Sequence, residues 1–361
     1  MISFETIAQK ALTNTPLTQD ECLHILTEGD LLTCLNHAFT VRKQFFDNKV
    51  AIHIINNAQN GACPEDCGYC PQAKNSSAPI EKYRLKSEFE ILEEARQAYE
   101  SGAKRYCMVS SGRGPKEKRI SDLATMIKKI KAKYPIEICV SAGLLDEDKA
   151  AVLKEAGLDR LNHNLNTSEK HYPKICTTHT YEDRLQTLEA AQKTGLEICS
   201  GIIIGMGESH EDMITVAQEL RRLEAPSIPV NYLVPIKGTQ FEEMPDLTPE
   251  FCLRVLALFR FTNPKAEIRV AAGRELHFRS MEVMSLYPAN SLFLEGYLNT
   301  RGQEALKLYQ MIQDAGFEIE SEKSIDDMVQ KEQAKESIKQ ATDSIVMKTL
   351  EDLRPAIQEK A

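Results

Sequence analysis

Eight short segments rich in β-branched and aliphatic residues alternate with helical patterns from residue 51 onward, and this alternation limits the fold more than any other feature. The segments are AIHIINN (51–57), RYCMVSS (105–111), IEICVSA (136–142), RLNHNLNT (160–167), EICSGIIIG (197–205), SIPVNYLV (227–234), EIRVAAG (267–273) and SLFLEG (291–296). Between them, apolar residues recur every three or four positions, as in amphipathic helices. Eight β/α units in series predict an α/β protein, a parallel (β/α)8 barrel of the TIM type, and an open doubly wound sheet is the alternative.

The helical segments carry their own start and stop signals. In SEFEILEEARQAYESG, Ser87 is suited to cap the start and Gly102 to end the helix, while Leu92, Ala95 and Ala98 recur on one face. Further helices are predicted at 119–133, 146–156, 180–194, 209–223, 248–261 and 301–315.

The chain on either side of the barrel pattern differs in character. Residues 1–48 are predicted to form an N-terminal helical extension, in which Thr18 and Glu21 have the spacing of a capping box. Residues 49–320 are predicted to form the barrel domain. After residue 320 the sequence is charged, contains neither glycine nor aromatic residues, and has apolar positions too sparse for a core. Residues 321–361 are therefore predicted to be a charged, helical or disordered tail.

Composition narrows the class of protein. A chain of 361 residues that is 42% hydrophobic can bury a large core, and one such barrel commonly uses about 250 residues. The formal charge of −9 argues against nucleic acid or an anionic membrane as a partner. The start lacks the apolar core of a signal peptide, and no run reaches the roughly 18 apolar residues of a membrane helix, so a cytoplasmic protein is expected. The ten cysteines are then expected to be ligands, catalysts or buried small residues instead of disulfides.

The loop NGACPEDCGYCPQAK carries three cysteines, Cys63, Cys67 and Cys70, in a C-x3-C-x2-C pattern. Four thiolates close the shell of a structural zinc ion, and disulfides use cysteines in pairs, so three leave one position open. This spacing suits three corners of an iron–sulfur cube whose fourth iron binds a substrate or cofactor. The alternative is a non-catalytic zinc or iron module, completed by a distant cysteine such as Cys34, Cys176 or Cys252.

A second set of cysteines is predicted to face the barrel interior, because side chains alternate between the two faces of a strand. The aliphatic residues of IEICVSA face the helices, which turns Cys139 inward, and the same count places Cys199 and Arg269 inside. Cys107 lies at the same height in its strand. A guanidinium inside a barrel needs an acceptor, and an anionic thiolate-ligated cluster would supply one.

Amide side chains line one face of the predicted strand RLNHNLNT. Its two leucines share a face, and Asn162, Asn164 and Asn166 share the other. Amides donate and accept in fixed geometry, which suits ribose hydroxyls or a urea-like ring, and Asn231 can add a further inward amide. His163 falls on the leucine side, so it is predicted to be a satisfied core histidine, with a catalytic role as the alternative.

The glycine-rich stretch GIIIGMGE ends the fifth predicted strand. It matches neither G-x-G-x-x-G nor a P-loop, so a phosphate site is discounted. Its glycines are instead expected to let a ligand approach the strand backbone.

Two motifs together resemble the radical S-adenosylmethionine superfamily. One is the cysteine loop with Tyr69 before its last cysteine, and the other is G-x-I-x-G-x-x-E, formed by Gly201, Ile203, Gly205 and Glu208. More narrowly, NGACPEDCGYCPQ, RYCMVSS, EICVSAGLL and PVNYLVPIKGT resemble the biotin synthase family, and the similarity extends over most of the chain.

The resemblance implies two clusters. The first would be a 4Fe–4S cluster, whose fourth iron chelates S-adenosyl-L-methionine and whose ligands would be Cys63, Cys67 and Cys70. The second would be a 2Fe–2S cluster, whose ligands would be Cys107, Cys139, Cys199 and Arg269.

The resemblance also implies contacts to the small molecules. The ureido ring of dethiobiotin would be bound by Asn162 and Asn231. Some members carry an acid where this chain has Asn166, which puts the affinity for S-adenosylmethionine in question more than the chemistry. The residues implied to contact S-adenosylmethionine are Tyr69, Asn164, Asn166, Gly201, Ile203, Gly205 and Glu208.

The implied activity is that of a sulfurtransferase in biotin synthesis. A 5′-deoxyadenosyl radical would take hydrogen from dethiobiotin, and the 2Fe–2S cluster would donate the sulfur. The residues implied to be catalytic are Cys63, Cys67, Cys70 and Arg269. The family further implies a reduced flavodoxin or ferredoxin as electron donor and a homodimer. The alternative is another radical S-adenosylmethionine barrel, such as a mutase or a cluster-maturation enzyme, which needs no second cluster.

Overall fold

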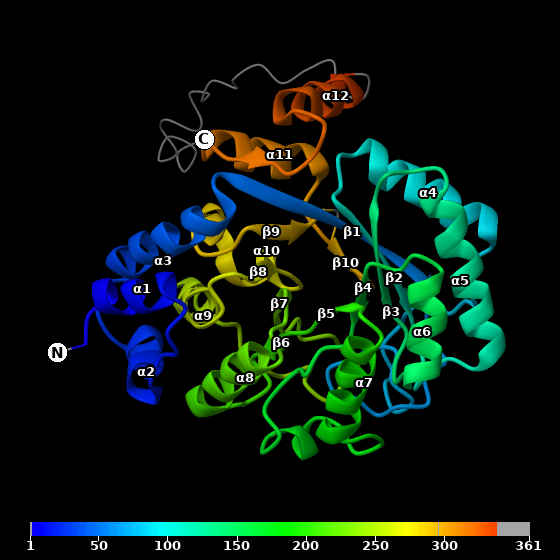
Figure 1. Ribbon diagram of the computed structural model, residues 1–361, viewed down its shortest axis with the longest axis horizontal. Coiled ribbons are helices and arrows are strands. Elements are labelled where there is room, and N and C mark those ends of the chain that lie inside the picture. Colours follow the sequence, from blue (N-terminus) through cyan, green and yellow to red (C-terminus); the bar gives the residue numbers. More distant parts are fainter. Residues whose placement is uncertain (1, 295, 338–361) are drawn as a thin grey trace, which may run out of the picture.

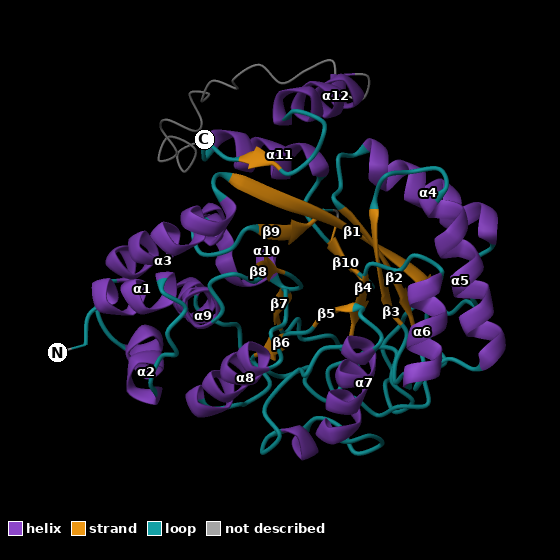
Figure 2. Cartoon of the chain, in the orientation of Figure 1, coloured by secondary structure: helices purple, strands orange, loops and turns teal. Residues whose placement is uncertain are grey.

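Parallel strands close into a barrel at the centre of the computed structural model, which describes residues 2–294 and 296–337 (Figures 1 and 2). The strands are β1 (Lys49–Gln59), β2 (Arg105–Ser110), β3 (Glu137–Ser141), β4 (Arg160–Asn162), β5 (Glu197–Cys199), β6 (Ile202–Ile204), β7 (Ser227–Tyr232), β8 (Glu267–Val270) and β9 (Ser291–Phe293). β5 and β6 both pair with β7 and share one place in the barrel, and β9 pairs with β1 to close it. The predicted eight-stranded barrel is confirmed, and the open sheet is wrong.

The helices between the strands pack around the outside of the barrel (Figure 2). They are α4 (Glu88–Glu100), α5 (Glu117–Lys131), α6 (Glu147–Glu155), α7 (Tyr181–Lys193), α8 (His210–Arg222), α9 (Pro249–Thr262) and α11 (Ala305–Asp314), and each overlaps a predicted segment. Ser87 caps α4 in a capping box, as expected. The helix buries Ala95 and Ala98 as predicted, whereas the third buried residue is Ile91 and Leu92 is only partly buried.

One part of the fold was not predicted. After β8 the chain forms the short helix α10 (Arg274–Phe278) and the 3-10 helix η2 (Arg279–Leu286). After β9 it forms a small hairpin of β10 (Gly296–Tyr297) and β11 (Thr300–Arg301). This hairpin supplies part of the wall of the site described below.

Three N-terminal helices pack beside α9, as Figure 1 shows. They are α1 (Phe4–Leu12), α2 (Gln19–Thr27) and α3 (Leu31–Phe46), and Thr18 and Glu21 form the expected capping box at the start of α2. Arg254 of α9 donates to the carbonyl oxygens of Glu28 and Gly29, at 2.8 and 2.7 Å. Every described residue of α9 from Cys252 onward is buried, because the extension covers the face that the barrel leaves free.

The chain after the barrel returns to the first strand. β12 (Glu318–Ile319) pairs in parallel with the start of β1, and α12 (Ile325–Ser337) packs against α11. Met328 and Val329 are buried, so the statement that the tail lacks apolar residues for a core is wrong for this part. The rest of the predicted tail, residues 338–361, lies outside the described residues. None of the helices in the described part of the chain combines the length and hydropathy needed to cross a bilayer.

Candidate active site

The strand register stacks three levels of polar side chains along the barrel. Charged residues occupy the beginnings of the strands, where Arg105 pairs with Glu137 and Arg160 lies 2.6 Å from Glu197. One step further along, Cys107 of β2 lies beside Cys139 of β3. Beyond the carboxyl ends of the strands lies a cavity of about 270 Å³, at the face where barrel enzymes place their active sites.

The predicted loop and amide residues meet in this cavity, which we call the upper cavity. Its wall includes Cys63, Tyr69, Cys70, Asn162, Asn164, Asn166, Ile203 and Asn231. These residues come from the loop after β1 and from the ends of β4, β6 and β7. The prediction that three asparagines of RLNHNLNT face one cavity is therefore confirmed.

Backbone hydrogen bonds hold the cysteine loop in place. The Gly68 N–H donates to the Ile175 carbonyl at 2.8 Å, and the Gly68 carbonyl accepts from Gln240 N–H at 3.1 Å. A side chain at Gly68 would meet Gln240 Oε1 at 2.4 Å, so glycine permits this close approach. Cys70 and Cys63 face the upper cavity, whereas Cys67 packs against Cys176.

The loop thiols differ from thiols in water. Burial raises the pKa of Cys70 to about 11, and burial likewise raises the pKa of Cys63. Cys63 and Cys67 are also close enough to Cys70 for charge on one thiol to disfavour charge on the next. Two of these thiols face the upper cavity and the third lies in the same loop, and each neutral thiol would release its proton on binding a metal cluster.

A smaller cavity, which we call the lower cavity, lies deeper in the barrel. Its wall includes Cys107, Cys139, Cys199 and Arg269, so the structure brings the predicted second set together. A hydrogen bond from the Cys139 thiol lowers the pKa of Cys199 and of Cys107 despite their burial. Arg269 Nη1 lies 3.7 Å from Cys199 Sγ and favours its thiolate further.

Arg269 has an acceptor in its own strand, Glu267, which the alternation of faces in EIRVAA also turns inward. Its guanidinium donates to the carboxylate of Glu267 and to Ser227 Oγ, the latter at 2.8 Å. Glu267 also lies 3.2 Å from Arg105 Nη1 and accepts from Ser227 Oγ at 3.1 Å. The prediction that this buried guanidinium needs an acceptor is thus met by Glu267 within the protein, and an anionic cluster is not required for this purpose.

Glu267→Gln should lower the free energy of unfolding by about 3 kcal/mol, because two buried guanidinium groups lose their shared anion. Burial opposes the charge of Glu267, but Arg105, His53 and Arg269 hold its pKa well below the usual range. Because the pKa of Glu267 is lower in the folded protein, the ionised carboxylate stabilises the fold at every pH above the glutamate pKa of about 4.3 in the unfolded chain. The difference should thus persist from about pH 5 to 8 and shrink only in stronger acid.

Denaturant unfolding of the cluster-free protein measures this effect. The control is Glu197→Gln, since Glu197 also pairs with an arginine but is more than half exposed. It should change the free energy by about 0.5 kcal/mol or less. Equal effects of the two substitutions would contradict a stabilising role for Glu267.

The two cavities share a wall. Asn162 lines both of them, together with Val109, Ser141 and Tyr297. Asn162 Nδ2 lies 3.3 Å from Cys199 Sγ and 3.3 Å from Asn164 Oδ1. A ligand held by Asn162 in the upper cavity would therefore lie next to the cysteines of the lower cavity.

The other amides are fixed to different degrees. Asn166, whose backbone has a φ of 71°, donates from Nδ2 to the Tyr69 hydroxyl at 2.6 Å. Asn231 donates to the Ile202 carbonyl at 3.0 Å and accepts from Ala272 N–H at 3.3 Å. Asn231 is therefore held rigidly by backbone groups before any ligand binds.

Three predicted cofactor contacts do not line the upper cavity. At Gly201 an added Cβ would meet the Pro229 carbonyl oxygen at 1.9 Å, so this glycine admits a neighbouring strand and not a ligand. Glu208 accepts hydrogen bonds from the backbone N–H groups of Gly205 and Met206, at 2.7 and 2.8 Å. Gly205 and Glu208 shape the turn after β6 and line a separate pocket, whereas Gly201 lies between β5 and β6, and none of the three lies in the wall of the upper cavity.

Arg184 of the upper cavity was not identified from the sequence. Arg184 of α7 is buried, lines the cavity and donates to the Asn164 carbonyl at 2.8 Å. Burial opposes its charge, but the phenol groups of Tyr69 and Tyr172 raise its pKa. The helical pattern gave no sign that this arginine points inward.

His163 also lines the upper cavity, and the prediction of a satisfied core histidine is wrong. Its side chain is buried, and its Nε2 has no hydrogen-bond partner among the described residues. Burial lowers its pKa well below the usual range, so the ring is neutral. Such a nitrogen is available to a polar ligand.

Family profiles match two consecutive parts of the chain. Residues 60–220 match the Radical SAM superfamily, and residues 229–318 match the Biotin and Thiamin Synthesis associated domain. The first match contains the cysteine loop, and the second contains Asn231 and Arg269.

Curated relatives named biotin synthase align with most of the chain. The one from Magnetococcus marinus is 59% identical over 300 residues, which cover 82% of this chain and 94% of the relative. The one from Acaryochloris marina is 56% identical, covering 82% of this chain and 86% of the relative. The one from Leptospira interrogans is 52% identical, covering 86% of this chain and 89% of the relative.

Solved structures of lower identity share the fold. Methylornithine synthase superposes with a TM-score of 0.76 at 20% identity, over 86% of this chain and 96% of that structure. The FeFe-hydrogenase maturase from Carboxydothermus hydrogenoformans superposes with a TM-score of 0.73 at 18% identity, over 88% of this chain and 79% of that structure. At these identities the likeness bears on the fold alone.

Proposed function

Because this chain belongs to the biotin synthase family of radical S-adenosylmethionine enzymes, it converts dethiobiotin into biotin by inserting sulfur, and we propose that its two cavities divide this reaction. When bound, a 4Fe–4S cluster and S-adenosylmethionine supply the 5′-deoxyadenosyl radical that removes hydrogen from the substrate, and a 2Fe–2S cluster supplies the sulfur. The observation that carries this division is the shared wall at Asn162.

The upper cavity is proposed to be the radical site. Cys63, Cys67 and Cys70 fit a 4Fe–4S cluster, because two of the thiols face the cavity and the third lies in the same loop. The buried guanidinium of Arg184 offers a cation to the carboxylate of S-adenosylmethionine. Asn164 offers an amide to its ribose hydroxyls.

The adenosyl end of S-adenosylmethionine is proposed to contact Asn166 and Ile203. The hydrogen bond from Asn166 to the Tyr69 hydroxyl leaves the Asn166 Oδ1 free to accept from a ribose hydroxyl. Ile203 adds apolar surface to the same wall of the upper cavity. Gly201 is proposed to act on this wall through its close approach to β7, and Gly205 and Glu208 through the backbone of the turn after β6.

The lower cavity is proposed to hold the sulfur donor. Cys107, Cys139, Cys199 and Arg269 fit a 2Fe–2S cluster, since three thiols and one guanidinium line a cavity closed by Phe293 and Ile55. The ureido ring of dethiobiotin is proposed to bind Asn162 and Asn231. Asn162 touches Cys199, so the substrate carbons would lie against the sulfur-donating level of the barrel.

An anaerobic turnover experiment tests the proposed function. The protein is reconstituted with iron and sulfide, then given S-adenosylmethionine, a reductant and dethiobiotin, and 5′-deoxyadenosine and biotin are quantified by mass spectrometry. Both products are expected, with about six irons per chain from one 4Fe–4S and one 2Fe–2S cluster. Formation of 5′-deoxyadenosine without biotin, with about four irons, would contradict the second cluster and favour another radical enzyme of this fold.

Arg269→Met should change the 2Fe–2S absorption and leave the 4Fe–4S signal intact, because Arg269 touches Cys199 and no residue of the cysteine loop. The matched control is Arg105→Met, which removes another buried guanidinium paired with Glu267. The control should leave both spectra unchanged. A 2Fe–2S spectrum that is the same in wild type and Arg269→Met would remove this arginine as a ligand.

Partners are proposed from the family relation alone. The electrons are proposed to come from a reduced flavodoxin or ferredoxin, and the chain is proposed to form a homodimer. Light scattering of the purified protein tests the dimer, and a monomer at micromolar concentration would contradict it. A location in the cytoplasm stays a prediction.

A further inference from the structure

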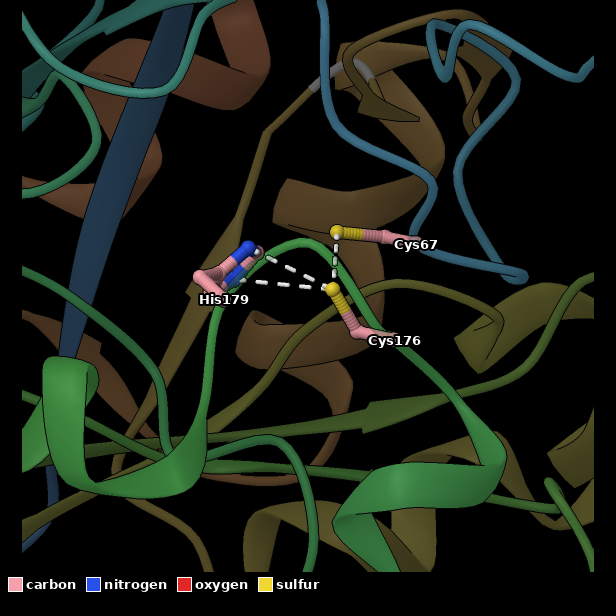
Figure 3. Close-up of side chains that lie close together, drawn as sticks. All are labelled: Cys67, Cys176 and His179. Atoms are coloured by element: carbon pink, nitrogen blue, oxygen red, sulfur yellow. Dashed lines mark hydrogen bonds between the residues drawn. The ribbon is translucent and has the colours of Figure 1, made fainter.

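Two thiols and an imidazole lie together beside the cysteine loop, outside the wall of the upper cavity. Figure 3 shows Cys67 facing Cys176 and His179, which belong to the segment between η1 (Tyr172–Lys174) and α7. All three side chains are buried, and their ligand atoms lie within 4.8 Å of one another. The family chemistry uses only Cys67 of this group.

The distances match a tetrahedral metal ion. Cys67 Sγ lies 3.7 Å from Cys176 Sγ, and two thiolates bound to one Zn²⁺ at about 2.3 Å lie roughly 3.8 Å apart. Cys176 Sγ lies 3.3 Å from Nδ1 and 3.9 Å from Nε2 of His179. A sulfur and a nitrogen on one Zn²⁺ lie about 3.6 Å apart, so small side-chain rotations suffice to reach a common ion.

His179 already has the partner that metal-bound imidazoles use. Glu65 Oε2 lies 2.5 Å from Nδ1, so Nδ1–H donates to this carboxylate and Nε2 carries the acceptor lone pair. Nε2 now accepts from Arg184 Nη2 at 2.9 Å. An ion bound at Nε2 would replace this contact and release the guanidinium toward the upper cavity.

We propose that Cys67, Cys176 and His179 bind a thiophilic divalent ion of the Zn²⁺ type in the protein that carries no cluster. Two sulfurs and one imidazole nitrogen are typical zinc ligands, and water can fill the fourth position. Both sulfurs bind as thiolates, so any thiol proton still present leaves as its metal–sulfur bond forms, and no group is oxidised or reduced.

Occupation of this site excludes the 4Fe–4S cluster, because both require the Cys67 thiolate. This consequence rests on the proposed role of Cys67 in the cluster, whereas the metal site itself does not. The cluster-free enzyme would thus have a defined zinc-bound state, from which zinc must leave before the cluster assembles.

Anaerobic titration of the full-length, cluster-free protein with Co²⁺ tests the site, because thiolate-bound Co²⁺ has a strong charge-transfer absorption. Cys176→Ala should bind one Co²⁺ fewer per chain than wild type. Cys63→Ala should bind as much as wild type, since Cys63 belongs to the loop but not to this group. Cys252→Ala, which removes a buried cysteine of α9, is the second control and should also match wild type.

Two outcomes would overturn the site. One is equal Co²⁺ binding by Cys176→Ala and wild type, and the other is loss of that Co²⁺ in Cys63→Ala, which would place the ion on the loop cysteines. Glu65→Gln should weaken the affinity by about 10- to 100-fold through the imidazole, and an unchanged affinity would remove His179 as a ligand. Circular dichroism establishes that each variant is folded.

Competition between Zn²⁺ binding and 4Fe–4S assembly tests whether the metal site excludes the cluster. One equivalent of Zn²⁺ should slow 4Fe–4S assembly in wild type and should leave assembly in Cys176→Ala at its zinc-free rate. Equal slowing of both proteins would contradict exclusion through this site. Failure of wild type to assemble a 4Fe–4S cluster without zinc would instead contradict the proposed function, so the two failures are distinguishable.

Discussion

Cys139→Ala should abolish biotin formation while 5′-deoxyadenosine still forms. The Cys139 thiol contacts both Cys107 and Cys199, so its loss removes the centre of the proposed 2Fe–2S site. We expect the 2Fe–2S absorption to disappear and biotin to fall by about 100-fold or more. The 4Fe–4S cluster lies in the other cavity, so cleavage of S-adenosylmethionine should continue.

The control for this variant is Cys252→Ala, because Cys252 is also a fully buried cysteine but lies in α9, remote from both cavities. It should keep both clusters and both products. Biotin formation by Cys139→Ala at the wild-type rate would contradict the lower cavity as the sulfur source.

Cys70→Ala should abolish both products. Cys70 lines the upper cavity between Tyr69 and Pro71, and its thiol is one of three proposed to hold the 4Fe–4S cluster. Two remaining thiols cannot hold three corners of the cube, so we expect 5′-deoxyadenosine to fall by about 100-fold or more. The 2Fe–2S absorption should remain, because no residue of the lower cavity is changed.

Iron and sulfide content, absorption spectra and both products are measured on the same preparations. Cys34→Ala is the control, since Cys34 is buried in α3 and touches neither cavity. Continued 5′-deoxyadenosine formation by Cys70→Ala would place the radical chemistry elsewhere in the chain.

Local periodicity explains why the barrel could be predicted. A strand such as IEICVSA is aliphatic on the face that packs against the helices. Cys139 lies on the opposite face and therefore points toward Cys107 and Cys199. The parallel pairing of the strands then places each inward residue at a defined level along the barrel axis. The lower cavity could thus be predicted one strand at a time.

Contacts between distant segments could not be predicted in this way. Cys67 and Cys176 are separated by 109 positions, and nothing in either local sequence indicates that the two thiols meet. Arg184 lies on a helix whose other polar residues are mostly exposed, so its inward orientation depends on Asn164 and Tyr172. Tyr297 reaches both cavities from a hairpin that the sequence pattern did not indicate.

The glycine-rich turn shows a different reason for error. Gly201 was expected to admit a ligand, but a glycine signals only that something approaches its backbone closely. In this fold the neighbour is the Pro229 carbonyl of β7. Similarly, Glu208 accepts hydrogen bonds from backbone N–H groups of its own turn, and the sequence pattern does not indicate this role.

The central claim is that two iron–sulfur sites stand one above the other in a single barrel. Diffraction from crystals of the anaerobically reconstituted protein, with anomalous scattering measured at the iron edge, tests it most directly. We predict one iron site against Cys63, Cys67 and Cys70 and a second among Cys107, Cys139, Cys199 and Arg269. A single iron site at the loop, with no anomalous signal in the lower cavity, would contradict the account.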